Sequence, residues 1–268
     1  MSPTRIIVTI FLYILTSIHI LIAQNGPNAE AYFRKADDLN KNMQPDSAII
    51  YYEKAAVEFL ALGNSEKWID AYNQIGIILT RQDKYVEARL YLEKVLSGRY
   101  YLPDTNNLVV ATTYISLGVV YSAEENYNQS LIFHFKALAI RLEKLGEQDA
   151  LVATSYGNIG NVYRYIGELD KSIEAHTKAM NIRESVFGEE SPEIVESYAG
   201  LGNAYREKKD YPSSLKCFEK ALNNKIFQRG EGHKDLVKYY NYISEVYYLM
   251  ENKEQGDRYK AKADAIDN

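Results

Sequence analysis

Two histidines at a spacing of 42 are the first residues of this 268-residue chain whose types and positions could do chemistry. Imidazole is a common metal ligand, so His134 and His176 could in principle share a metal ion. No third ligand accompanies the pair, whereas structural zinc sites almost always have four. The bulky positions of a packed helix are the simpler use of both rings. We therefore predict packing histidines, no metal site and no cofactor.

The sequence gives equally little support for covalent catalysis by a cysteine or for nucleotide binding. Cys217 is the lone cysteine, so the chain cannot form an internal disulfide, and no histidine or acid is tied to this thiol by a motif. Gly200-Leu201-Gly202 resembles part of a phosphate-binding loop, but no strand precedes it and it lies within a helical pattern. Because no catalytic constellation emerges, we predict a protein that is not an enzyme.

A repeated polar motif is more informative. Asn161 and Arg164 recur as Asn203 and Arg206, again at a spacing of 42. An asparagine side chain offers both a donor and an acceptor to an extended peptide backbone. An arginine offers a planar fork to a carboxylate. The motif therefore suggests binding of a peptide segment that carries acidic residues.

The composition limits the partner classes. The chain has 46% hydrophobic and 25% charged residues, enough apolar material for a packed core. Its net charge of −5 provides no basic surface for a nucleic-acid backbone, so we expect no nucleic-acid partner.

The amino-terminal sequence resembles a signal peptide for export. Arg5 precedes the apolar run Ile6–Ala23, and polar residues follow it. We expect residues 1–23 to be a signal peptide and the protein to be periplasmic or secreted. The length of the run is at the lower limit of a membrane span, so the alternative is an uncleaved membrane anchor.

A strict repeat organises the rest of the chain. Five tyrosines follow one another at a constant spacing of 42, and four positions after each comes glycine, or serine in the last copy: Tyr72, Tyr114, Tyr156, Tyr198 and Tyr240, then Gly76, Gly118, Gly160, Gly202 and Ser244. An earlier, less regular copy starts at Tyr32. Apolar spacings of 4, 7, 8 and 11 define one face of a helix. Glycine inside a helix is costly, so its fixed phase predicts a very close neighbour there.

A second helix follows each first helix after a polar turn. Apolar and small residues again recur at helical spacing, as in Ala88, Leu92 and Val95. Three of these second helices run on to a Gly-Glu pair, at Gly146, Gly188 and Gly230. Glycine just past a helix end predicts a left-handed C-cap at each of the three.

These residues carry a family resemblance. The pattern Tyr-x-x-Leu-Gly-x-x-Tyr with a later alanine resembles the tetratricopeptide repeat (TPR), and the period of 42 and the Gly-Glu loop are most similar to the kinesin-light-chain subtype. The match covers roughly Ala29 to Asp267. It implies an all-α fold, a right-handed superhelical solenoid of about six antiparallel helix pairs, with repeats that start near 29, 69, 111, 153, 195 and 237 within an array over residues 24–268. Ser244, Gly256 and the polar last helix depart from the pattern, and a polar last helix suits a terminal cap.

The resemblance also implies where a ligand would bind. In this family the first helices line a concave groove. The positions expected to face the groove are apolar in the earlier repeats and polar in the later ones. The candidate binding residues are Ile77, Ile115, Val119, Asn158, Asn161, Arg164, Asn203, Arg206, Glu245 and Tyr248.

We accordingly expect a non-catalytic scaffold or adaptor outside the cytoplasm, which binds a peptide or partner protein in its groove. The alternative is a sensor or regulatory component that acts with a separately encoded effector. A membrane enters either hypothesis only through an uncleaved Ile6–Ala23.

Overall fold

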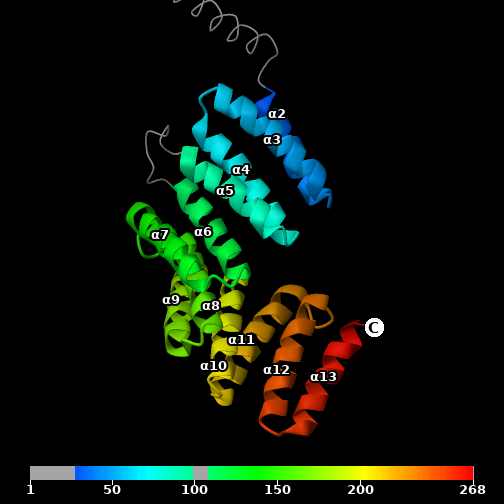
Figure 1. Ribbon diagram of the computed structural model, residues 1–268. Coiled ribbons are helices and arrows are strands. Elements are labelled where there is room, and N and C mark those ends of the chain that lie inside the picture. Colours follow the sequence, from blue (N-terminus) through cyan, green and yellow to red (C-terminus); the bar gives the residue numbers. More distant parts are fainter. Residues whose placement is uncertain (1–27, 99–107, 268) are drawn as a thin grey trace, which may run out of the picture. The chain divides into compact units, whose positions relative to one another are not determined.

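The chain is all-helical. The computed structural model describes residues 28–98 and 108–267, which form twelve α-helices and contain no strand (Figure 1). The apolar run Ile6–Ala23 lies outside these residues. Among the helices that are described, none is both long and apolar enough to cross a membrane.

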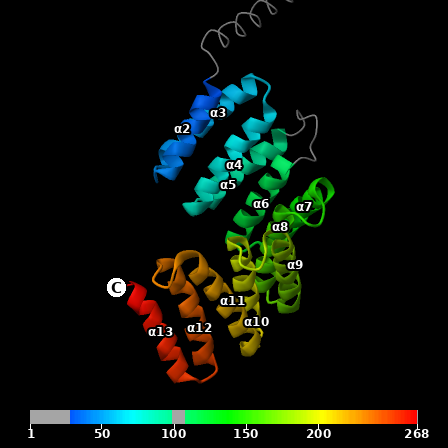
Figure 2. The same cartoon turned by 180° about the vertical axis from the view of Figure 1, so that it is seen from behind.

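The helices form pairs, each of which corresponds to one sequence repeat. The chain divides into two compact units, residues 1–105 and 106–268. The first unit holds α2 (Ala29–Lys41), α3 (Pro45–Ala61), α4 (Ser65–Arg81) and α5 (Tyr85–Gly98). The second holds α6 (Leu108–Ala123), α7 (Tyr127–Leu145), α8 (Ala150–Tyr165), α9 (Leu169–Phe187), α10 (Val195–Glu207), α11 (Tyr211–Arg229), α12 (Val237–Leu249) and α13 (Lys253–Asp267). In Figure 2 the two helices of each pair run antiparallel, and we number the six pairs as repeats one to six.

One backbone conformation makes the turn inside each pair. The residue at the same position of every described repeat has a positive φ, between 58° and 79°: Met43, Asp83, Glu125, Gly167, Lys209 and Glu251. The next helix then starts from a polar residue, and the side chain of Asn126, Asp210 or Asn252 accepts a hydrogen bond from the backbone of its first turn. These caps satisfy amide groups that the helix itself leaves unpaired. The turns are therefore fixed by backbone geometry and by capping.

The recurring glycines mark a close approach, as their phase predicts. A Cβ added to Gly76, Gly118, Gly160 or Gly202 would come within 2.4–2.7 Å of a side chain on the second helix of the same repeat. The fillers are Leu92, His134, His176 and Phe218. We call each such glycine and its surroundings a glycine notch. The notch lets the two helices of a pair approach each other through one bulky side chain.

The glycines of the Gly-Glu loops differ from the expected left-handed C-cap. Gly146, Gly188 and Gly230 do follow the ends of α7, α9 and α11, with φ between 80° and 87°. Their ψ angles lie between 162° and 174°, far from the left-handed helical region. This extended conformation with positive φ is essentially restricted to glycine. The prediction of glycine was right for the position and wrong for the cap geometry.

The last pair has its own closing contacts. Ser244 occupies the glycine position of repeat six, and its hydroxyl donates to the carbonyl of Gly256 on α13 at 2.8 Å. Only Gly256 and Ala263 of α13 are buried. The other residues of this helix meet solvent at least in part, as the polar sequence of Lys253–Asp267 requires.

Candidate functional site

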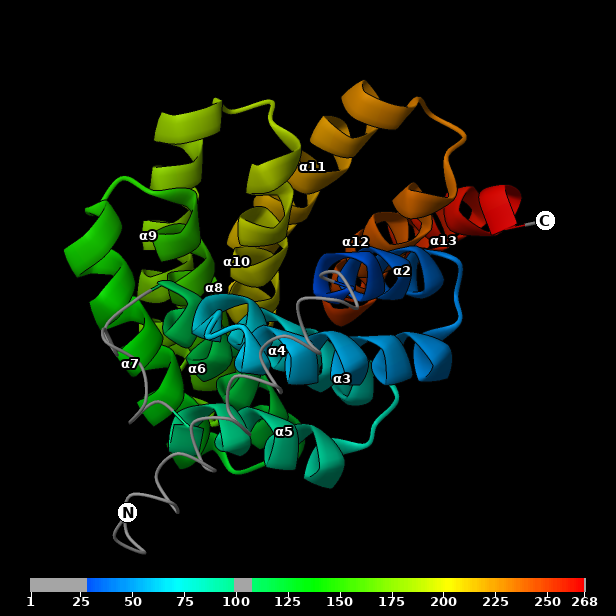
Figure 3. The same ribbon diagram turned by 90° about the horizontal axis from the view of Figure 1, so that it is seen from above.

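The second unit contains two neighbouring pockets along its first helices. Figure 3 shows α7 and α9 on the outer side of α6 and α8. One pocket, of about 380 Å³, lies between α6 and α8, and the other, of about 300 Å³, lies between α8 and α10. Asn158 and Asn161 line both. We call the two pockets together the groove, and they bring several candidate residues into one site.

The first pocket is largely apolar and aromatic. Val119, Tyr127, Val162 and Tyr165 line it together with the polar side chains of Ser122 and Glu125. The rings of Tyr127 and Tyr165 stack with centroids 5.8 Å apart. Val119 is 40% exposed, so its side chain is accessible from the groove.

The second pocket is polar. Asn161 and Asn203, the asparagines of the repeated motif, line it together with Thr154, Tyr242 and Asn158. Glu196 and Lys238 also line it, and their charged groups pair with each other at 3.2 Å. The amide side chains are therefore placed to hydrogen-bond a polar ligand.

Arg183 supplies a positive charge to this second pocket. It belongs to α9, a second helix, and its guanidinium donates to the Ser197 hydroxyl on α10 at 2.5 Å. On the other side, a Cβ added to Gly157 of α8 would lie 4.0 Å from a guanidinium nitrogen. Burial lowers the pKa of Arg183, while Glu196 and Glu193 raise it. No carboxylate in the described part of the chain lies within ion-pair distance of this guanidinium.

The equivalent residue of the preceding repeat, Arg141, is enclosed. Its guanidinium donates to the Leu151 carbonyl and to the Ser155 hydroxyl, both at 2.9 Å. The side chain is only 4% exposed, whereas Arg183 is half-buried and lines a pocket. Arg141 therefore stabilises the fold, and Arg183 has donors left for a ligand.

The two arginines of the Asn-x-x-Arg motif are engaged within the chain. The guanidinium of Arg164 lies 2.5 Å from the Glu207 carboxylate, and that of Arg206 lies 2.6 Å from the Glu245 carboxylate. Each pair joins first helices of successive repeats. A ligand carboxylate would have to compete with Glu207 or Glu245 for these forks.

The remaining candidates lie outside the two pockets. Ile77 is on α4 of the first unit, and Ile115 is half-buried on α6. The Tyr248 ring packs against Gly256, and its hydroxyl donates to Asp257 at 2.8 Å. Glu245 is held by Arg206. Among the candidates, Val119, Asn158, Asn161 and Asn203 are the ones that line the groove.

The two histidines fill glycine notches. His134 packs against Gly118, and His176 packs against both Gly160 and Gly200. Burial lowers the pKa of each imidazole to about 4, helped by Arg141 for His134 and by Arg164 and Arg183 for His176. Both rings are therefore neutral at pH 7. They occupy the same packing position as Leu92 and Phe218.

The surroundings of Cys217 disfavour a reactive thiolate. Burial raises the pKa of the Cys217 thiol to about 11, which disfavours the nucleophilic thiolate. Within residues 28–98 and 108–267, no three His, Cys, Asp or Glu side chains are grouped to hold a metal ion.

A second regular feature joins the helices of every pair. In each described repeat, a lysine ammonium on the second helix lies over the ring of a tyrosine on the first helix, 5.0–5.9 Å from its centroid. The pairs are Lys54–Tyr32, Lys94–Tyr72, Lys136–Tyr114, Lys178–Tyr156, Lys220–Tyr198 and Lys262–Tyr240. Neither these constant lysine–tyrosine pairs nor Arg183 was predicted from the sequence. Both could have been found by comparing second helices, where Arg141 and Arg183 also recur at a spacing of 42.

Comparison with known families covers more than half of the chain. The tetratricopeptide-repeat family model matches residues 109–185 and 151–226, and a second model of the same description matches residues 68–99. No curated protein matches the sequence.

Solved structures of low sequence identity share the fold. BtubC (BKLC) from P. vanneervenii is 17% identical with a TM-score of 0.71, over 81% of this chain and 89% of that one. A putative kinesin light chain of Podospora anserina with nearly identical TPR-like repeats is 14% identical with a TM-score of 0.64, over 74% and 94% of the two chains. A signal transduction ATPase with numerous domains (STAND) and a tetratricopeptide-repeat sensor, from Pyrococcus horikoshii, is 17% identical with a TM-score of 0.63. The alignment covers 91% of this chain and 42% of that protein.

Proposed function

Because the chain belongs to the tetratricopeptide-repeat family and shares its fold with solved kinesin-light-chain-like repeats, we propose that it is a protein-interaction scaffold. Its ligand is an extended peptide segment that carries an acidic side chain, and the segment binds in the groove of the second unit. The position of Arg183 carries this proposal: it is a half-buried guanidinium in a pocket lined by three asparagines.

The chemistry of the groove favours such a ligand. Asn158, Asn161 and Asn203 offer amide donors and acceptors, which suit the alternating N–H and C=O groups of an extended backbone. The guanidinium of Arg183 uses one hydrogen bond on Ser197 and keeps other donors for a carboxylate. A partly desolvated arginine strengthens such a bond, because less water competes for the charge.

Binding of matched peptides to the full chain tests this proposal. The probes are unstructured octapeptides with two central aspartates and the same peptides with asparagines there. Hydrogen bonds to charged groups contribute about 1.5–3 kcal/mol, so Arg183→Gln should raise the dissociation constant of the aspartate peptides by roughly tenfold or more. Lys220→Gln is the control, because it removes the same charge from α11 outside the groove. Calorimetry measures both affinities.

Two outcomes would contradict the acidic ligand. Equal affinity for the aspartate and asparagine peptides would show that the negative charge of the ligand does not contribute to binding. Unchanged binding by Arg183→Gln, with an unchanged melting temperature, would place the ligand elsewhere. Arg183→Lys is a second variant that keeps the charge but not the fork.

The scaffold acts, in this proposal, outside the cytoplasm. The support is the sequence pattern of Arg5 followed by the apolar run Ile6–Ala23, which resembles a signal peptide. If the segment is not removed, it anchors the protein to a membrane.

A second candidate function is that of a sensor that works with a separate effector. It is favoured by the likeness to the STAND protein, where the repeats are described as the sensor of a larger signalling protein. An effector encoded beside this chain, whose activity changes when the purified chain is added, would support that role. If the activity of the effector does not change when the chain is added, the sensor role is contradicted and the scaffold role remains.

A further inference from the structure

Helix α3 is apolar on both of its faces. Its inner face buries Tyr52, Ala55, Ala56 and Phe59 in the first unit. On its outer face, Ile50, Val57 and Leu60 are 52%, 66% and 57% exposed. Exposed apolar side chains that lie together on one face are a common mark of an interaction surface. The outer face of α3 is therefore a candidate contact surface.

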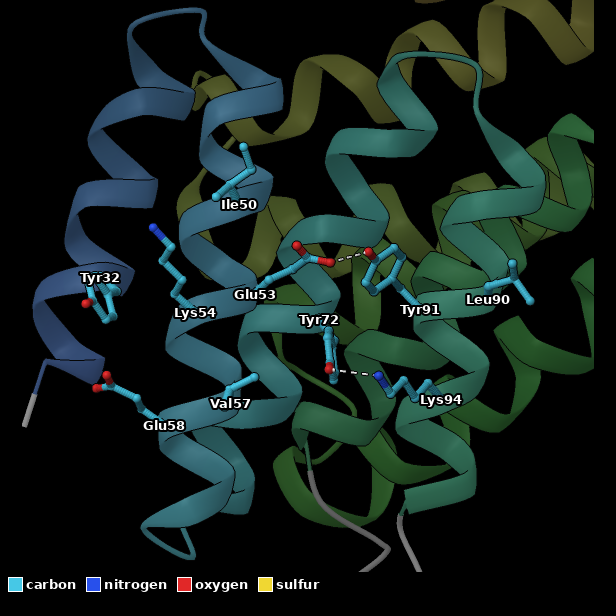
Figure 4. A pocket seen from close by; sticks show the side chains of 10 residues that line it. All are labelled: Tyr32, Ile50, Glu53, Lys54, Val57, Glu58, Tyr72, Leu90, Tyr91 and Lys94. Atoms are coloured by element: carbon cyan, nitrogen blue, oxygen red, sulfur yellow. Dashed lines mark hydrogen bonds between the residues drawn. The ribbon is translucent and has the colours of Figure 1, made fainter. Parts of the chain in front are cut away.

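The same surface continues across a broad trough to α5. The trough has a volume of about 850 Å³ and is lined by residues of α2 to α5, with Leu90 of α5 61% exposed (Figure 4). Figure 4 also shows its two internal hydrogen bonds. The Tyr91 hydroxyl donates to the Glu53 carboxylate at 2.5 Å, and the Lys94 ammonium donates to the Tyr72 hydroxyl at 3.1 Å. Burial and that carboxylate raise the pKa of Tyr91 to about 12, so its hydroxyl keeps its proton.

The apolar character is not a general demand of the repeat. Ile50 and Leu90 occupy the same position of repeats one and two, and Ile132 occupies it in repeat three. In repeats four to six the position holds charged residues, namely Glu174, Lys216 and Arg258. Since these later helix pairs form equally well, the fold of the pair does not require an apolar residue at this position.

The charges on this surface are balanced. Two positive side chains, Lys54 and Lys94, and two negative ones, Glu53 and Glu58, line the trough. In the part of the chain that the structure describes, neither lysine has a carboxylate partner, and Glu58 has no cationic one. A ligand of one charge sign would be repelled by half of these groups. A second copy of the same surface, turned by a two-fold axis, offers a glutamate for each lysine and an apolar stripe for the apolar stripe.

We propose that the outer face of α3 and α5 is a self-association surface, where two copies of this chain pack as a two-fold symmetric dimer. The contact centres on Ile50, Val57 and Leu90, and the lysines and glutamates pair across its edges. This surface is independent of the groove of the second unit, so it stands or falls separately from the acidic peptide ligand.

Sedimentation equilibrium of the full chain from 1 µM to 1 mM tests the proposal at concentrations on the order of those where such contacts form. The wild-type chain should dimerise within this range. Leu90→Glu should raise the dissociation constant by at least about tenfold, because two-fold symmetry places two unpaired carboxylates in one apolar contact. Ile132→Glu is the matched control, since it makes the same change at the same repeat position on α7. It should leave the dissociation constant unchanged.

Three results would overturn the proposal. One is a chain that stays monomeric at 1 mM, where even a weak dimer would form. Another is an equal effect of Leu90→Glu and Ile132→Glu, which would place the association elsewhere. The third is a monomer that binds phosphatidylcholine vesicles unless Leu90 is replaced, which would assign the face to a lipid surface. Leu90 is exposed, so the variant should keep its melting temperature, and Val57→Glu provides an independent repeat of the test.

Discussion

The guanidinium of Arg164 on α8 lies 2.5 Å from the carboxylate of Glu207 on α10, and this contact ties the first helices of repeats four and five together. Both side chains are partly exposed to solvent. Exposed ion pairs contribute roughly 0.2–1 kcal/mol, so Arg164→Ala should lower the free energy of unfolding by less than about 1 kcal/mol in urea titrations.

The same pair distinguishes the two arginine roles in binding. If Arg183 binds the acidic side chain, the double variant Arg164→Ala with Arg206→Ala should raise the dissociation constant of the aspartate peptides by only about threefold or less. The reason is that both guanidinium groups already pair with carboxylates of the chain. Glu207→Gln would release Arg164. A gain of affinity in Glu207→Gln, with a large loss in the double variant, would return the acid-binding role to the first helices.

Two alanine substitutions three residues apart on α8 should have opposite effects. A Cβ on Gly157 finds only a nitrogen of Arg183 at 4.0 Å, so Gly157→Ala should stabilise the protein by roughly 1 kcal/mol through helix propensity. A Cβ on Gly160 would lie 2.7 Å from the His176 ring, which is held between two helices, so Gly160→Ala should destabilise it by about 1–2 kcal/mol. Thermal melting checks both signs, and a stabilising Gly160→Ala would refute the notch.

Stability should fall as the pH drops below 7. The pKa values of His134 and His176 are about 4 in the folded chain, below the 6.5 of an unhindered histidine. The unfolded chain therefore binds more protons between those values, and stability is lost as the pH falls through this window. From pH 7 to pH 5 the loss should be about 2 kcal/mol for each histidine.

Phenylalanine provides the control for this pH dependence. Phe218 fills the same notch position in repeat five, so His134→Phe and His176→Phe should fold. The double variant should show a flatter stability curve between pH 7 and pH 5, measured by urea unfolding. A curve as steep as that of the wild-type chain would assign the dependence to other groups.

Equivalent serines on the second helices should also respond differently to alanine. The Ser214 hydroxyl donates to the Gly202 carbonyl at 2.8 Å, so Ser214→Ala should cost about 1 kcal/mol. The Ser172 hydroxyl is buried without a partner in the described structure, so Ser172→Ala should be neutral or stabilising. Ala88 already occupies this position in repeat two. Equal losses at both serines, in chemical denaturation, would contradict the hydrogen-bond assignment.

Export gives a direct chemical prediction. Protein isolated from its own host should begin at or near Gln24, as amino-terminal sequencing would show. A chain that keeps Ile6–Ala23 and sediments with membranes would instead be anchored.

The local rules of the sequence predict most of this fold. Tyrosine and glycine at fixed helical phases place both helices of each pair and the close approach at Gly118 or Gly160. These features depend on residues within one repeat, where the helical period relates sequence to space. The positive φ of Met43, Glu125 and Lys209 was beyond prediction, because these residue types carry no clear signal for that conformation.

The candidate site was predicted less well, because it depends on contacts between repeats. Asn161 and Asn203 were found from their recurrence, and they line the groove. The partner of Arg164 is 43 residues away, and no spacing rule singles out Glu207 among many surface acids. Arg183 enters the groove from a second helix, and its direction follows from the packing of α9 against its neighbours.

The glycine notches also limit how such a gene can change. Each notch and its filler belong to one repeat, as in Gly118 and His134, so duplication or deletion of a whole repeat carries both together. His176 is different, because it also lies against Gly200 of the next repeat. Deleting repeat five would bring Tyr242, the residue at the same position of repeat six, to the place of Gly200. Loss of repeat five alone would therefore set a tyrosine side chain against the His176 ring, where repeats four and five now meet through glycine.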